Sequence, residues 1–279
     1  PPVLALMVRE YYDRMPDKAW LAGAYERLKI ENAFWMERRK NESGLNRYDC
    51  EPLPEAWVKH SSKSAIARWG FRPEGMDDDA MGRANHAAGE SGWDFTPRMS
   101  WEVFNYAALD LNSWLYAQED QLAYFAGELG LAEEQKHWEN VRDQRAALCR
   151  QYLKGEDGVF YDYHEVKKER SSLVSAATYY PLYVGMATQE EADAAVKVLP
   201  RVEEKYGIAC VEKCDVPGNY QWGHPNGWPP TQRIVVDGLL RYGYREDALR
   251  IANKYCDLVE SCFAKTGHLW EKYNVVKII

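Results

Sequence analysis

Apolar residues recur along most of the chain at the spacing of one face of an α-helix. One stripe runs from Leu4 to Met15, and a second runs from Leu21 to Trp35. Asp17 stands between them, just after Pro16, where its side chain can accept hydrogen bonds from the first turn of the second helix. The pattern therefore predicts two helices within the first forty residues.

Six more helices are predicted downstream. The third runs from about Leu111 and stops at Gly130, because glycine favours the left-handed conformation that ends helices. The others fall near 132–152, 171–186, 189–205, 231–242 and 244–263. A short hairpin-like stretch at 158–163 is almost all the strand signal there is. Short links between successive helices indicate antiparallel pairs, and we expect an all-α fold.

Three long connections have no clear periodicity: residues 40–62, 70–100 and 207–230. They are rich in Gly, Pro, Asn, Asp and Trp. Long irregular loops in a compact domain are usually functional or disordered, and the tryptophans argue against disorder. With no linker or repeat to divide the chain, we expect one domain over residues 1–279 that carries aromatic, carboxylate-bearing loops at one end of a helical scaffold.

Composition narrows the classes of function. Lys and Arg number 35 against 43 Asp and Glu, a formal net charge of −8, which argues against a nucleic-acid partner. Apolar runs stay far below the ~20 residues that a bilayer span needs, so no membrane partner is expected. The six cysteines include no Cys-x-x-Cys pair, which favours free thiols in a reducing compartment such as the cytoplasm; disulfides or a metal site are the alternatives. The chain begins Pro1-Pro2-Val3 without methionine, as expected for a piece of a longer protein.

The sharpest candidate for chemistry is the segment Glu90–Arg98. Asp94 lies between Trp93 and Phe95, and apolar walls raise the pKa of a carboxyl group by desolvation. Arg98 could oppose that shift or bind a hydroxyl group of a substrate. The alternative is that Asp94 only caps a turn.

Two other loops combine aromatic and polar side chains. Residues 221–230 place Gln221 and Asn226 among Trp222 and Trp228, an arrangement that suits sugar hydroxyls and the apolar face of a sugar ring. The alternative is a rigid loop whose tryptophans plug the end of the scaffold. Near the C-terminus, Glu271 is a second carboxylate in an aromatic setting.

Other chemistries lack their motifs. There is no Gly-x-Gly-x-x-Gly, phosphate loop or Gly-x-Ser-x-Gly, and the six histidines do not fall at metal-ligand spacing. The aspartates at 77–79 fit a helix N-terminus or a solvated loop better than a metal site. Two separated carboxylates, Asp94 and Glu271, remain, and glycoside hydrolysis requires such a pair.

Four segments in order resemble the trehalases, glycoside hydrolase family 37. Arg72-Pro73-Glu74 resembles the family's Arg-Pro-Glu-Ser, and Glu90–Phe95 resembles its Glu-Ser-Gly-Trp-Asp-Phe/Tyr, with Arg98 at the arginine that follows. Gln221–Pro230 resembles the second family signature, and Trp270–Tyr273 resembles its Glu-Lys-Tyr-Asp. The opening residues also resemble a Gln-Pro-Pro-x-x-Ala-Leu stretch inside such enzymes.

The resemblance implies an (α/α)6 barrel, incomplete in this chain, and hydrolysis of α,α-trehalose to two glucose molecules with inversion. Asp94 would be the general acid and Glu271 the general base, with their carboxyl groups ~6.5–9.5 Å apart. The substrate-binding residues would be Arg72, Glu74, Trp93, Arg98, Gln221, Trp222, Asn226 and Trp228. No metal or cofactor is implied.

Some positions depart from the family pattern. Gly223-His224 replaces an Asp-x pair, and Asn274 stands where the family has Asp. The first family signature and the glycine-rich segment ending in Gly-Glu-Tyr are missing, and eight expected helices fall short of the twelve of a full barrel. Two alternatives therefore stay open: a relative similar to family 63 glycosidases that cleaves another α-glucoside, and an inactive truncated barrel that binds sugar.

Overall fold

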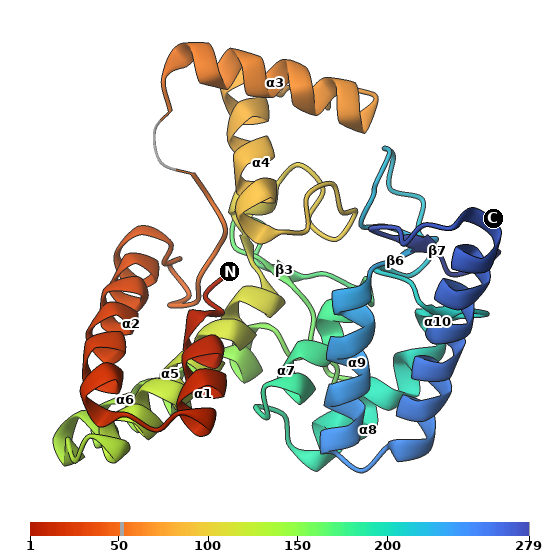
Figure 1. Ribbon diagram of the computed structural model, residues 1–279. Helices are drawn as coiled ribbons and strands as arrows, with labels where there is room; N and C mark the ends of the chain where they lie inside the picture. Colours follow the sequence, from red (N-terminus) through yellow and green to blue (C-terminus); the bar gives the residue numbers. More distant parts are fainter. Residues whose placement is uncertain (51–52, 279) are drawn as a thin grey trace.

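Helices form almost all of the regular structure of the chain (Figure 1). The computed structural model describes residues 1–50 and 53–278. Its α-helices are α1 (Leu4–Arg14), α2 (Lys18–Arg38), α3 (Glu55–Trp69), α4 (Asp78–Ser91), α5 (Leu109–Glu128), α6 (Ala132–Tyr152), α7 (Tyr180–Tyr183), α8 (Gln189–Val198), α9 (Pro229–Arg241) and α10 (Arg245–Thr266). Short 3-10 helices are η1 (Val103–Asn105), η2 (Ala176–Tyr179) and η3 (Leu199–Arg201). The expected all-α class is confirmed.

Seven short strands pair parts of the chain that lie between the helices. They are β1 (Tyr106–Ala107), β2 (Tyr163–His164), β3 (Glu169–Arg170), β4 (Glu203–Glu204), β5 (Gly207–Ile208), β6 (Asn226–Gly227) and β7 (Tyr273–Asn274). β1, β2 and β3 form one antiparallel sheet, and β4–β5 and β6–β7 are antiparallel pairs. The hairpin expected at 158–163 thus falls just before and into β2. The β6–β7 pair joins two loops that the sequence singled out.

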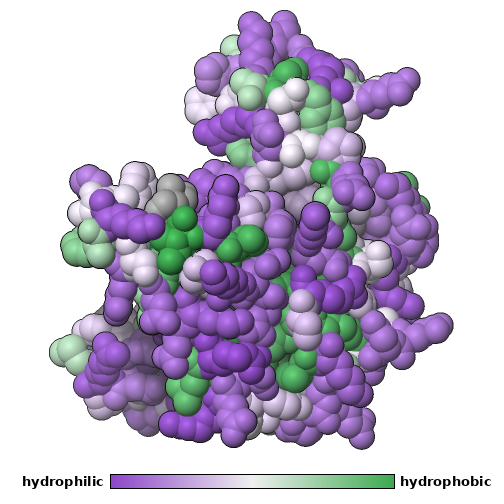
Figure 2. Space-filling view, turned by 90° about the vertical axis from the view of Figure 1, so that its right-hand side faces the viewer, coloured by the Kyte–Doolittle hydropathy of each residue, from purple (hydrophilic) through white to green (hydrophobic). Residues whose placement is uncertain are grey.

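Successive helices pack as pairs, as their short links predicted. α3 packs on α4, α5 on α6 and α9 on α10. In Figure 1, α1, α2, α5 and α6 occupy one side of the molecule, while α7 to α10 occupy the other. The α3–α4 pair lies above both groups, and Figure 2 shows its top as a lobe narrower than the body below.

Helix α5 is the most deeply buried of the long helices. Of its 20 residues, 14 are buried, and these include the polar side chains Asp110, Asn112, Gln118 and Glu119. Burying such groups is costly unless each finds a partner. Partners exist here: Arg145 pairs with Glu119 at 2.7 Å, and Asn32 bonds Gln118 at 3.0 Å. α5 is therefore the inner helix on which the surrounding pairs are built.

Two helices begin at aspartates whose side chains cap the first turn. The side chain of Asp17 accepts hydrogen bonds from the N–H groups of Ala19 and Trp20, so it caps α2 as predicted. Asp77 caps α4 by accepting from the N–H of Ala80 at 2.8 Å, and Asp78 and Asp79 occupy the first turn. The aspartate triplet is therefore a helix N-terminus.

The expectation that 40–62 and 70–100 are irregular is wrong at 55–62 and 78–91, which belong to α3 and α4. Their packed faces consist mostly of small side chains, which leave no stripe of large apolar residues. A Cβ atom added at Gly82 on α4 would lie 2.9 Å from Cγ1 of Val58 on α3. Close packing of small residues replaces the usual hydrophobic periodicity, and the chain has ten α-helices among its described residues rather than eight.

Two expected helices are shorter than their apolar patterns suggested. The helix expected at 171–186 is reduced to η2 and α7. The helix expected at 189–205 ends at Val198, and η3 follows with Pro200 at its start. Proline lacks the N–H that an α-helix would need at that point, which explains the early end. In the described residues, no helix has both the length and the apolar character to cross a membrane.

Candidate functional site

Two loops meet at the carboxylate of Asp94. α4 ends at Ser91, and the next residue, Gly92, has φ of +72°; this left-handed turn directs the chain into the 93–98 loop. The half-buried side chain of Asp94 accepts a hydrogen bond of 2.6 Å at Oδ2 from Nε2 of Gln221. A backbone bond of 3.2 Å from Trp222 N–H to the carbonyl of Phe95 fixes the two loops together. The second and third sequence segments therefore form one unit.

Three tryptophans form a wall beside Asp94. The rings of Trp222 and Trp228 stack with their centroids 4.1 Å apart and their planes 6° apart. Trp93 lies 5.2 Å from Trp222, and Nε1 of Trp228 donates to the carbonyl of Gln221 at 2.9 Å. Each of the three side chains is at most 8% exposed. The rings mainly pack on one another, which makes the wall rigid.

The C-terminal segment joins this wall through strand pairing. β6 pairs with β7, so that Gly227 lies opposite Tyr273, and Val275 N–H donates to the carbonyl of Pro225 at 3.0 Å. The ammonium group of Lys272 lies 5.4 Å from the centre of the Trp228 ring. Glu271 precedes Lys272 and is exposed, as is Trp270. The fourth segment is thus held at the edge of the wall by its backbone.

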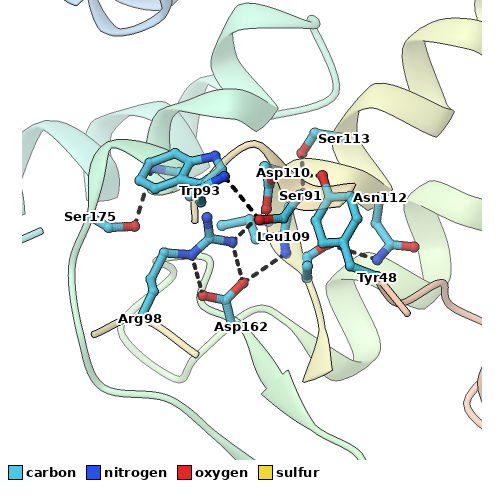
Figure 3. Close-up of polar contacts among 12 residues, drawn as sticks. Tyr48, Ser91, Trp93, Arg98, Leu109, Asp110, Asn112, Ser113, Asp162 and Ser175 are labelled. Atoms are coloured by element: carbon cyan, nitrogen blue, oxygen red, sulfur yellow. Dashed lines mark hydrogen bonds and ion pairs between the residues drawn. The ribbon is translucent and has the colours of Figure 1, made fainter. Parts of the chain in front are cut away.

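Arg98, at the end of the 93–98 loop, is 1% exposed, and Figure 3 shows its guanidinium group between Trp93 and Asp162. Its Nε and Nη2 atoms each donate a 2.7 Å hydrogen bond to Asp162, and Nη2 also reaches Asp110 at 2.5 Å. The guanidinium group lies 4.7 Å from the centre of the Trp93 ring. A side chain this buried has almost no surface to offer a sugar. Arg98 instead anchors the loop that carries Asp94.

The network around Arg98 extends into the scaffold. Asp162 also accepts from the backbone N–H of Leu109 at 2.8 Å, and Asp110 accepts from the hydroxyl of Tyr48 at 2.7 Å. Burial alone would lower the pKa of Arg98, but the two carboxylates outweigh it and hold that pKa well above its ordinary value. Burial, together with Asp110, raises the pKa of Tyr48 well above its ordinary value. Arg98 therefore stays charged and Tyr48 stays neutral.

Sequence reasoning missed Asp110, Asp162 and Tyr48. A signal was present for the two aspartates, because Asp110 interrupts an apolar helical run and Asp162 lies between two tyrosines. An aspartate is almost never fully buried unless it is paired, so an aspartate in an apolar setting indicates a buried partner. Tyr48 gave no comparable signal.

Arg72 and Glu74 lie in the turn between α3 and α4, and no contact among the described residues joins them to the Asp94 wall. Both are exposed. Arg72 pairs with Asp78, and its Nη1 donates to the carbonyl of Met76 at 3.1 Å. Trp69, three residues before Arg72, contacts both other loops: its ring lies 5.3 Å from that of Phe95, and its carbonyl accepts from Asn219 N–H at 3.2 Å. This turn therefore borders the 217–220 loop.

Asn226 and Gly223 have structural reasons for their identity. Nδ2 of Asn226 donates to the carbonyl of Tyr220 at 3.3 Å, within its own loop. A Cβ atom at Gly223 would lie 2.9 Å from Cβ of Tyr220 and 3.2 Å from Cδ of Pro97. An aspartate at position 223 would therefore require Tyr220 and Pro97 to shift. The next residue, His224, bonds Glu204 at 2.9 Å.

Side chains that could bind a metal ion are not grouped into a site in the described part of the chain. No group of three or more His, Cys, Asp or Glu side chains is placed to hold a metal ion there. The cysteines are free, and Cys149, Cys210 and Cys262 are buried. The site consists of carboxylates, amides and indoles.

Comparison with known proteins shows which family this chain resembles along its length. The family model for trehalase matches residues 1–278. A probable trehalase of Saccharomyces cerevisiae is 35% identical over 218 residues, which cover 71% of this chain and 28% of that protein. A periplasmic trehalase of Xanthomonas campestris is 31% identical over an alignment of 304 positions, which covers 99% of this chain and 51% of that protein. The chain thus spans about half the length, or less, of these curated relatives.

Solved structures show the same fold. Neutral trehalase Nth1 from Saccharomyces cerevisiae superposes with a TM-score of 0.84 at 26% identity, over 99% of this chain and 58% of that chain. A GH63 mannosylglycerate hydrolase from Thermus thermophilus gives a TM-score of 0.64 at 18% identity, over 99% and 72% of the two chains. The second likeness concerns the fold alone. Together they place the helix pairs in the (α/α)6 barrel class.

Proposed function

Because the chain belongs to the trehalase family, we propose that it is an inverting glycosidase that hydrolyses α,α-trehalose to two glucose molecules. One observation carries this proposal most directly. The carboxylate of Asp94 accepts a hydrogen bond from the side chain of Gln221, beside the stacked rings of Trp222 and Trp228. A carboxyl group oriented next to amide and indole groups suits protonation of a glycosidic oxygen.

The proposed mechanism uses two carboxyl groups. Asp94 in its acid form gives its proton to the glycosidic oxygen as the bond to the anomeric carbon breaks. Glu271 takes a proton from a water molecule, which attacks the anomeric carbon from the opposite face. Gln221 occupies Oδ2 of Asp94, so we assign the proton transfer to Oδ1. Room for the water requires a separation of ~6.5–9.5 Å between the two carboxyl groups.

The remaining residues divide into two roles. We assign Gln221, Trp222, Asn226 and Trp228 to the sugar subsite next to Asp94. Trp93 at 3% and Arg98 at 1% exposed are more buried than Trp222 and Trp228 at 8%, so we assign Trp93 and Arg98 the role of holding the Asp94 loop. Arg72 and Glu74, which border the 217–220 loop, would belong to the outer rim of the pocket. The substrate is a small disaccharide in this proposal.

Two features favour alternatives that an assay can separate. Gly223 removes a carboxylate found in the family signature, which would relax selectivity toward another α-glucoside. Glu271 is exposed, and Trp270 beside it is 52% exposed, whereas a general base usually acts in a shielded cleft. A barrel that binds sugar without hydrolysing it would show this exposure.

A substrate panel tests the proposal. Release of glucose by the purified chain is measured with trehalose, kojibiose and glucosylglycerate, and binding of trehalose is measured separately by calorimetry. We expect turnover of trehalose to exceed that of the other two. Turnover of another α-glucoside but not trehalose would support the family 63-like alternative. Binding of trehalose without glucose release would support the sugar-binding barrel.

A further inference from the structure

Phe95, the residue after Asp94, has a backbone conformation that its side chain disfavours. Its φ angle is +62°, in the left-handed region, where the Cβ atom of an L-residue comes too close to a backbone carbonyl oxygen. Glycine adopts this region without strain, whereas bulky residues are rarely found there. The chain uses glycine for the left-handed turn at Gly92, three residues earlier. Other contacts of Phe95 must therefore offset the strain of this second turn.

The ring of Phe95 is held inside the α3–α4 pair. It is 4% exposed and belongs to one buried cluster with Trp69 of α3 and with Met81 and Ala84 of α4. It meets the ring of Trp69 edge to face, with the centroids 5.3 Å apart and the planes 79° apart. The guanidinium group of Arg68 lies 5.1 Å from its centre. Burial of this large apolar ring, together with the edge-to-face contact, can stabilise a strained backbone.

The carbonyl group of Phe95 is held from another direction. It accepts a hydrogen bond of 3.2 Å from the N–H of Trp222. The φ angle is a rotation about the N–Cα bond, so when ring and carbonyl are both fixed, φ decides where the preceding residue, Asp94, lies relative to them. An ordinary negative φ would turn Asp94 relative to the loop that carries Gln221. The 2.6 Å bond from Gln221 to Oδ2 of Asp94 therefore depends on the left-handed turn.

We propose that Phe95 is a positioning residue for the reaction. The packing of its ring on Trp69 keeps the left-handed turn in place, and the turn keeps the Asp94 carboxyl group where it can protonate the glycosidic oxygen. This inference rests on the proposed role of Asp94 as the general acid. The ring lies in the α3–α4 core and does not reach the substrate. Loss of the ring should therefore slow proton transfer, which depends on the position of the acid, rather than weaken sugar binding.

Two variants separate the turn from the ring. Phe95→Ala and Phe95→Gly both lose the ring, but only glycine adopts a left-handed φ without strain. With trehalose we expect kcat to fall about 100-fold in Phe95→Ala and about 10-fold in Phe95→Gly, with KM within about threefold of wild type. Met81→Ala opens a cavity in the same cluster and leaves residue 95 unchanged, so it should lower stability but not kcat. Equal losses of kcat in the two Phe95 variants, or a wild-type kcat in both, overturn the proposal.

A substrate whose leaving group needs no proton isolates the acid. In α-glucosyl fluoride the C–F bond breaks with departure of fluoride, and the water that Glu271 deprotonates forms the new C–O bond. Hydrolysis of the fluoride therefore depends little on Asp94. We expect Phe95→Ala to stay within about threefold of the wild-type rate on this substrate. A loss as large on the fluoride as on trehalose would indicate general damage to the site and would overturn the proposal.

Crystal structures of wild type and Phe95→Ala test the positioning without turnover. We expect the bond between Gln221 and Asp94 in wild type, and its loss in the variant together with a negative φ at position 95. A left-handed residue 95 with the bond intact in the variant overturns the proposal. Inactivity of the wild-type chain toward every α-glucoside would refute the proposed function, and these structures would still decide whether Phe95 positions Asp94.

A third variant covers the case in which Phe95→Ala does not fold. Phe95→Leu keeps most of the buried volume but not the edge-to-face contact with Trp69. We expect it to lose about fivefold in kcat on trehalose and to keep the wild-type rate on α-glucosyl fluoride. Wild-type rates on both substrates, or equal losses on both, overturn the proposal.

Discussion

The side-chain amide of Gln221 donates a 2.6 Å hydrogen bond to the carboxylate of Asp94 across 127 positions of sequence. Gln221 comes from the loop before α9, and Asp94 from the loop after α4. The bond is reinforced by the backbone contact between Trp222 and Phe95. The bond fixes one oxygen of a half-buried carboxylate. A substitution of Gln221 should therefore affect mainly the orientation of the Asp94 carboxylate.

Replacing Gln221 with alanine tests this orientation. The bond goes to a carboxylate, and such bonds are worth about 1.5–3 kcal/mol. We therefore expect Gln221→Ala to lower kcat/KM for trehalose roughly 10- to 100-fold, with a free energy of unfolding close to that of wild type. Gln189→Ala, on the exposed face of α8, is the control and should leave the rate unchanged. An unchanged rate in Gln221→Ala contradicts the assigned role.

Arg98 is predicted to be important for stability. Lysine keeps the charge but cannot reproduce the forked contacts to Asp110 and Asp162. Because the site is fully buried, we expect Arg98→Lys to lower the free energy of unfolding by about 2–4 kcal/mol in a urea titration. Arg233→Lys, an exposed arginine on α9, should change it by less than ~0.5 kcal/mol. A small effect at both positions would show that the buried network contributes little.

Substitutions at Gly223 test whether glycine is needed there for packing or whether the missing carboxylate limits activity. An aspartate there would restore the family residue, yet its Cβ atom would press on Tyr220 and Pro97. We expect both Gly223→Ala and Gly223→Asp to lower stability by about 1–3 kcal/mol, and Gly223→Asp not to raise trehalose turnover. Gly23→Ala is the matched control, because Gly23 is inside α2 with open space around it and alanine favours the helix. A more active Gly223→Asp would show that the missing carboxylate, rather than packing, governs the site.

The stability of the α6–α8 contact should depend on pH. Burial alone would raise the pKa of Glu191, but hydrogen bonds from Arg150 and from the backbone of Thr188 hold it below its ordinary value. A depressed carboxyl pKa stabilises the fold above the unfolded value of about 4.3 and loses this effect as pH falls through the folded value. Glu191→Gln should therefore cost about 2 kcal/mol at pH 7, and the difference from wild type should shrink below about pH 4.3.

The control for this pH dependence is the neighbouring Glu190→Gln, which alters an exposed carboxylate. Thermal unfolding of the three proteins is followed from neutral to acid pH. A gap between wild type and Glu191→Gln that stays constant with pH would contradict the role of the charge.

Helices with apolar stripes could be predicted from the sequence, and α1 (Leu4–Arg14) lies within the stripe expected from Leu4 to Met15. α3 and α4 were not predicted although the buried residues of α4 recur at helical spacing, because most of these side chains are small and no stripe of large apolar residues stands out. Pro200 is a feature of the sequence that favours an earlier end for the helix predicted at 189–205.

The site could be predicted in part. Motif composition singled out Asp94, Gln221 and the tryptophans, and the fold brings them together. Arg98 was expected to face a substrate, but its burial depends on Asp110 and Asp162, whose proximity follows only from the tertiary structure. The same is true of the contact between the rings of Phe95 and Trp69, which joins the Asp94 loop to α3. Contacts between distant segments are what a single sequence reveals least.

The central claim is that Asp94 and Glu271 are the acid and base of a trehalose hydrolase. The most direct test compares initial rates of glucose release from trehalose by wild type, Asp94→Asn and Glu271→Gln, with trehalose binding measured in parallel. Asp257→Asn and Glu260→Gln on the exposed face of α10 are the matched controls. We expect both site variants to lose at least about 100-fold in kcat while still binding trehalose, with the controls at wild-type rates. Near-normal turnover in either site variant would contradict the account.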